Sequence, residues 1–89
     1  MKHGIIIRTN GTTERVEPEN GIDFTTEELQ RIVGRVFDIT NIDDHFHMIF
    51  NATKEDLPFN DFATYIVRSG QRKNKPFQIF GDAFVKEMG

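Results

Sequence analysis

The stretch Gly4-Ile-Ile-Ile-Arg-Thr-Asn-Gly-Thr-Thr-Glu-Arg-Val16 opens the chain with two strand-forming runs, residues 4–8 and 12–16. Asn10 and Gly11 lie between them. Asn-Gly is the strongest short signal for a β-hairpin, because both residues tolerate the positive φ that a two-residue turn requires. The stretch therefore predicts an antiparallel hairpin.

The next segment, residues 24–29 (Phe-Thr-Thr-Glu-Glu-Leu), has the pattern of a helix start. Thr25 suits the N-cap position, and Glu28 stands three residues later, where its carboxylate can reach back to the cap. We expect this short helix to end at Gly34, in the left-handed conformation that glycine adopts easily.

A second hairpin is predicted over residues 36–40 and 45–50, which are β-branched and aromatic and are separated by the connection 41–44. Side chains alternate between the two faces of a strand, so every second residue of each run is a candidate for the core. These core-facing candidates are Phe37, Ile39, Phe46, Met48 and Phe50.

The last third of the chain is more ambiguous. Asn60 is a good N-cap for a second helix that would run from residue 61 to near Gly70, yet residues 64–67 are strand formers, so helix and strand both remain open. Residues 71–76 form an expected loop. Residues 77–80 and 83–85 are strand material, interrupted by Gly81 and Asp82.

These elements give the order ββαββαβ and predict an α+β fold in which a largely antiparallel sheet packs against two short helices. With 89 residues, we expect one domain over residues 1–89. A domain of this size buries only roughly 60% of its unfolded surface, so self-association into a homo-oligomer is an expected way to gain burial.

Composition narrows the class of protein. The chain has no cysteine and no apolar run of membrane-spanning length, so we expect a cytoplasmic protein without a membrane partner or an export signal. Residues 9–61 hold 12 acids against 4 bases, whereas residues 62–89 hold 5 bases against 2 acids. The net charge of −3 argues against general nucleic-acid affinity.

Several short motifs together resemble the small family catalogued as domain of unknown function 3846. They cover nearly the whole chain and consist mainly of turn and cap residues: Asn10-Gly11, Val16-Glu17-Pro18, Asn20-Gly21, residues 24–30 with Val33-Gly34, Leu57-Pro58-Phe59-Asn60 and residues 79–83. The resemblance implies an accessory protein of a phage or plasmid, acting in a bacterial cell or an infected bacterial host. It implies no activity, and Arg35 stands where members of that family often carry a second glycine.

One run has the residue types of a metal site. Asp43, Asp44, His45 and His47 offer carboxylates and imidazoles, and the two histidines are expected on the same strand face. Two histidines without an assured third ligand are more typical of an exposed strand, and paired aspartates are typical of turns. We therefore expect no bound metal or other cofactor. A metal-dependent hydrolase that uses these residues is the alternative. His3 could add a ligand, but nothing in the sequence places it near the run.

A basic loop is the candidate anion site. Arg68, Arg72, Lys73 and Lys75 surround a serine and a glycine, and such groups can bind phosphate, although the run matches no known nucleotide-binding loop. An exposed loop without a ligand is the simpler interpretation. A weak nucleic-acid-binding regulator that uses this loop is a further alternative.

No order of serine, histidine and acid typical of a catalytic triad is present. Our leading hypothesis is a non-catalytic binding protein of a mobile genetic element that acts on a host protein or sequesters a small anionic ligand. Four aromatic side chains are candidates for a pocket or dimer face rather than the core: Phe59, Phe77, Phe80 and Phe84. An acidic stretch from Glu14 to Glu28 either faces a basic partner or serves helix and turn structure.

Overall fold

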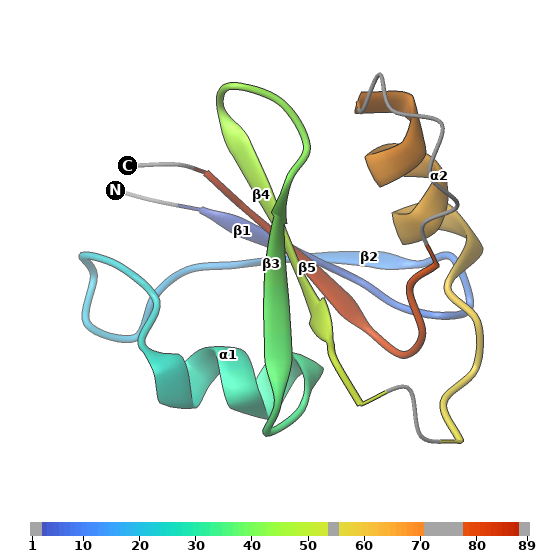
Figure 1. Ribbon diagram of the computed structural model, residues 1–89. Helices are drawn as coiled ribbons and strands as arrows, with labels where there is room; N and C mark the ends of the chain where they lie inside the picture. The colour runs from blue at the N-terminus through green and yellow to red at the C-terminus, as the bar shows by residue number, and fades with distance from the viewer. Residues whose placement is uncertain (1–2, 54–55, 71–77, 88–89) are drawn as a thin grey trace.

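The computed structural model describes residues 3–53, 56–70 and 78–87 and confirms the α+β class. The elements follow the predicted order: β1 (Gly4–Ile7), β2 (Thr13–Val16), α1 (Thr26–Val33), β3 (Phe37–Asn41), β4 (Phe46–Asn51), α2 (Asp61–Gly70) and β5 (Ala83–Glu87). The five strands form one antiparallel sheet in the order β2-β1-β5-β4-β3. The strand that comes last in the sequence therefore lies at the centre of the sheet (Figure 1).

The first hairpin forms around Asn10 and Gly11 as predicted, but its turn has three residues, and Asn10 does not take the positive φ that a two-residue turn requires. Gly11 has φ of +87°, its N–H donates to the carbonyl of Arg8, and the side chain of Asn10 accepts from the N–H of Thr12. Each strand is one residue shorter than expected at the turn, since pairing begins at Ile7 and Thr13.

Helix α1 starts with the predicted capping box. The N–H of Glu28 donates to the Thr25 hydroxyl, and the Glu28 carboxylate accepts from the N–H of Thr25. The predicted left-handed ending is wrong in detail, because Gly34 has φ +119° and ψ +166°, an extended conformation that is open essentially to glycine alone. The chain must leave α1 directly into β3, and the Asn51 amide donates to the carbonyl of Val33 in place of a left-handed cap.

The second hairpin is shifted by one residue from the prediction. Asp43 accepts hydrogen bonds from the N–H groups of His45 and Phe46, and Ile42 donates to the carbonyl of Phe46. The connection consequently spans residues 42–45, and β4 begins at Phe46 rather than at residue 45.

Two separate cores flank the sheet, with one helix on each face. Ile6, Ile49 and Phe84 pack with residues of α1, whereas their neighbours Ile7 and Met48 pack with residues of α2. Alternate residues of the same strands therefore point to opposite helices.

The helices cover the sheet only partly. Met48 and Phe50 are buried as predicted on the α2 face, and Phe37 packs against the α1 core. Ile39 and Phe46 were predicted as core residues, but they remain 50% and 40% exposed. The prediction was wrong for both because neither helix extends over these positions.

Helix α2 follows Asn60 and confirms the helical interpretation over the strand alternative. Residues 78–80 do not continue as a strand, contrary to the prediction. Phe80 makes only an isolated bridge to Phe59, and Gly81 turns the chain with φ of +78° before β5 begins. Phe77 and the predicted loop at residues 71–76 lie outside the described residues.

Candidate binding groove

The position of α2 is fixed by a buried asparagine. Asn60 is fully buried; its Oδ1 caps the helix by accepting from the N–H of Ala63, and its Nδ2 donates to the carbonyls of Ile7 and Gly81 at 2.9 Å each. Thr64, one turn into the helix, accepts from the N–H of Ile79. These bonds hold the start of α2 over the end of β1, so the described part of the chain leaves the other end of this sheet face uncovered.

The uncovered part of the sheet face and the adjacent side of α2 enclose an apolar groove of about 350 Å³. Its floor comes from the sheet and the β3–β4 connection, and its wall from the helix. The lining residues are Ile5, Ile7, Thr13, Ile42, Phe46, Val85, Phe62 and Ile66. We call this set of eight residues the α2 groove.

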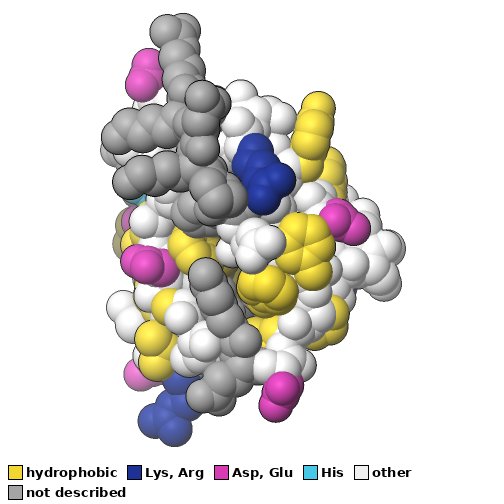
Figure 2. Space-filling view, turned by 45° about the vertical axis from the view of Figure 1, so that its right-hand side comes forward, with side chains coloured by type: hydrophobic (Ala, Val, Ile, Leu, Met, Phe, Trp, Pro, Cys, Tyr) yellow, Lys and Arg dark blue, Asp and Glu magenta, His cyan; other side chains and the backbone are white. Residues whose placement is uncertain are grey.

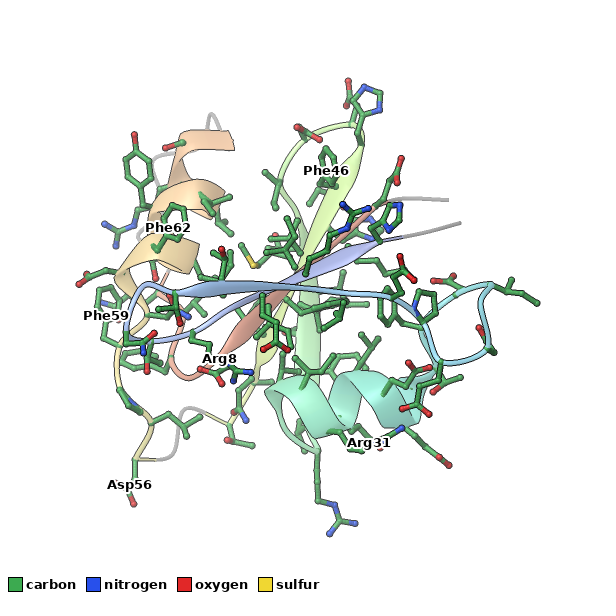
Figure 3. The ribbon with its side chains drawn as sticks, turned by 180° about the vertical axis from the view of Figure 1, so that it is seen from behind. Arg8, Arg31, Phe46, Asp56, Phe59 and Phe62 are labelled. Carbon is green, nitrogen blue, oxygen red and sulfur yellow. The ribbon has the colours of Figure 1, made fainter. Side chains whose placement is uncertain are left out.

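Large apolar side chains in the α2 groove are open to solvent. Ile5, Phe46 and Phe62 are 42%, 40% and 42% exposed. Phe62 on α2 and Phe46 at the start of β4 lie on the two sides of the groove (Figure 3), and apolar side chains reach the surface on the side of the molecule that carries α2 (Figure 2). An apolar pocket of this kind is the usual first candidate for a binding site.

The lining of the α2 groove is suited to burying apolar groups of a partner. None of its eight residues is charged, and the Thr13 hydroxyl is its one polar side-chain group. The groove can therefore take up apolar groups, but its own lining supplies no acid, base or thiol for a reaction.

The predicted anion site is only partly described. Arg68 is exposed in the last turn of α2. Arg72, Lys73 and Lys75 lie outside the described residues, so the anion site stays a prediction.

The structure separates the residues of the weak metal candidate at positions 43–47. His45 lies in the turn before β4, so the prediction that it shares a strand face with His47 is wrong. The Asp43 carboxylate is engaged by two backbone N–H groups, and Asp44 is exposed in the same turn. His3 contacts Arg15 and Glu17 instead. Within residues 3–53, 56–70 and 78–87, no three histidine or acidic side chains are grouped so as to hold a metal ion.

The acidic stretch serves structure at most of its positions. Glu19 pairs with Arg31 at 2.9 Å, and Asp23 pairs with Lys86 at 3.1 Å. The N–H groups of Glu19 and Thr25 donate to the buried Glu28 carboxylate and lower its pKa. These contacts favour the structural interpretation over a site for a basic partner.

None of the described aromatic candidates lines the α2 groove. Phe84 is fully buried on the α1 face, where its ring meets that of Phe24 edge to face at 4.8 Å. Phe59 and Phe80 pack on each other at 5.5 Å, and Phe77 is not described. The α2 groove was missed by sequence reasoning, although the strand pattern already put Phe46 on the face that forms its floor.

In comparisons with known proteins, no protein-family model, no curated protein and no solved structure gives a significant match to this chain. The α2 groove therefore has to be interpreted from its own geometry, and the resemblance to domain of unknown function 3846 stays a prediction. No helix within the described ranges is long and apolar enough to cross a membrane.

Proposed function

We propose that the protein is a non-catalytic binding protein of a mobile genetic element, and that it acts on a host protein whose apolar side chains enter the α2 groove. The observation that carries the proposal is the exposure of Phe46 and Phe62 on the two sides of one uncharged groove. Covering the exposed parts of these two rings removes apolar surface from water, at about 25 cal/mol per Å², and aromatic side chains are enriched in protein interfaces.

The groove favours a protein partner over the small anionic ligand. An anion would gain nothing from the uncharged lining of the α2 groove. The resemblance to a family of phages and plasmids supports the expectation that the partner belongs to the bacterial host and that the complex forms in the cytoplasm.

Site-specific photo-cross-linking in bacterial cells tests this function. A photoreactive phenylalanine analogue is placed at Phe62 in the groove or, as the control, at Ile39, which is similarly exposed on the other sheet face. We expect one discrete protein adduct from position 62, no such adduct from position 39, and loss of the adduct when Phe46→Lys is added. Equal adducts from both positions, or none from either, would contradict the proposal.

A further inference from the structure

We infer that the partner segment that occupies the α2 groove is a single amphipathic helix lying beside α2. The inference rests on the proposed function and specifies its partner. It starts from the floor of the groove, which is a sheet face rather than a sheet edge.

A partner segment that lies on the floor can contact its side chains, but the backbone N–H and C=O groups of the interior floor strands are already paired within the sheet. Its strand residues belong to β2, β1, β5 and β4, and the ladders that join these strands run β2-β1-β5-β4 without a break. An extended peptide that adds to a sheet pairs with the outer edge of a terminal strand. In this sheet those edges belong to β2 and β3, whereas most of the floor belongs to the interior strands β1, β5 and β4. An element that satisfies its own backbone, as a helix does, can lie on the floor without leaving polar groups unpaired.

The extent of the groove fits one helix. Its lining runs from Thr13 on β2 to Ile42 beside the end of β3, across the whole five-stranded sheet. Four strand spacings amount to about 19 Å, which a helix of about 13 residues spans. Helix α2 shows that this face accepts a helix, since Ala63 and Val67 pack on it next to the groove.

The same extent disfavours a second copy of the chain. A stable interface between two folded proteins uses about 20–30 residues on each side, whereas the α2 groove has eight. The wall residues Phe62 and Ile66 are spaced i, i+4 and form the kind of apolar ridge that packs against a neighbouring helix. Since the lining is uncharged, the helix face that enters should carry apolar residues at i, i+3 or i+4, and i+7.

A designed peptide pair provides the test. The first peptide has about 13 residues, capped at both ends, with leucines at helical spacing on a background of alanine, glutamine, glutamate and lysine. The second has the same composition in an order that breaks the stripe. Both are titrated into the isotopically labelled protein, and binding is followed by NMR.

We expect the striped peptide to bind with shifts centred on the α2 groove and the scrambled peptide to bind at least about tenfold more weakly. Phe62→Lys and Phe46→Lys, each first shown to be folded by its own spectrum, should weaken the striped peptide about tenfold or more, while Ile39→Lys should not. Equal binding of the two peptides, or equal effects of all three variants, would overturn the inference that the partner segment is a helix. If a partner is cross-linked at position 62 but the striped peptide does not bind, the helical partner is wrong and the proposed function stands. If neither a cross-linked partner nor peptide binding is found, the proposed function is wrong as well.

Discussion

The side-chain amide of Asn60 donates a hydrogen bond to the main-chain carbonyl of Ile7 at 2.9 Å, across 53 residues of sequence. This bond joins the start of α2 to the end of β1 inside the protein, and a second bond to Gly81 joins it to the turn before β5. This buried amide therefore helps to set the position of α2 and of the α2 groove, together with the Thr64 bond to Ile79 and the packing of Ala63 and Val67.

Replacing this amide should be costly. Asn60→Ala removes the cap of α2 and leaves the buried carbonyls of Ile7 and Gly81 without their donor, so we expect a loss of about 3 kcal/mol in the free energy of unfolding. Asn20→Ala is the matched control, because the Asn20 side chain also bonds to the main chain, accepting from the N–H groups of Ile22 and Asp23, but lies in an exposed turn. Urea unfolding should show a small loss for Asn20→Ala; equal losses would remove the special role of Asn60.

Much of the fold is predictable because its signals are local. Thr25 and Glu28 bond to each other within three residues, and Asn10 accepts from Thr12 two residues away, so a short window contains all the necessary information. The second hairpin is shifted by one residue because the Asp43 side chain accepts a hydrogen bond from the N–H of His45. This local bond competes with strand pairing at His45.

The binding groove, by contrast, depends on distant contacts. Its lining comes from residues as far apart as Ile5 and Val85, which face each other only because β5 inserts between β1 and β4. Alternation along β3 and β4 showed which residues share a face, but not that the helices would leave Ile39 and Phe46 exposed. For Phe46 that outcome follows from the anchoring of α2 by Asn60, for which the sequence has no local signal beyond the cap. Ile39 lies on the other sheet face, which the short helix α1 covers only partly.

Gly34 should tolerate no side chain. Its backbone conformation is not the left-handed one that asparagine accepts, and an added Cβ would collide with the Asn51 amide that caps α1. We expect Gly34→Asn and Gly34→Val each to lower the free energy of unfolding by about 2 kcal/mol or more. A urea midpoint for Gly34→Asn close to that of the wild type would show that the left-handed cap was the correct prediction.

Gly4 should be equally intolerant for a different reason. A Cβ at Gly4 would overlap the ring of Phe84, which is fully buried between β1 and α1. Gly4→Ala is expected to destabilise by about 1–3 kcal/mol through overpacking. Thermal unfolding of the double variant Gly4→Ala, Phe84→Leu checks the cause: the Gly4→Ala change should cost less in the Phe84→Leu background, and an unchanged cost would exclude the collision.

Acid should weaken the fold through Glu28. The N–H groups of Glu19 and Thr25 hold the pKa of this carboxyl below its ordinary value of 4.5. A carboxyl with a lowered pKa in the folded state stabilises the fold above the unfolded-state pKa, and this stabilisation is lost as the pH falls through the folded-state value. The wild type should therefore lose its advantage over Glu28→Gln as the pH is lowered below 4.5 in urea unfolding measurements. A gap between the two proteins that stays constant down to acid pH would contradict the assignment.

The central claim is that the α2 groove is open and takes up apolar groups, and the isoleucine methyl groups report on it directly. Ile5, Ile7, Ile42 and Ile66 line the groove, whereas Ile39 and Ile49 lie on the other face of the sheet. The measurement is a methyl NMR titration with the apolar dye 1-anilinonaphthalene-8-sulfonate. Our account predicts saturable shifts in the four groove isoleucines and little change at Ile39 and Ile49; shifts of equal size at Ile39, or none at any isoleucine, would contradict it.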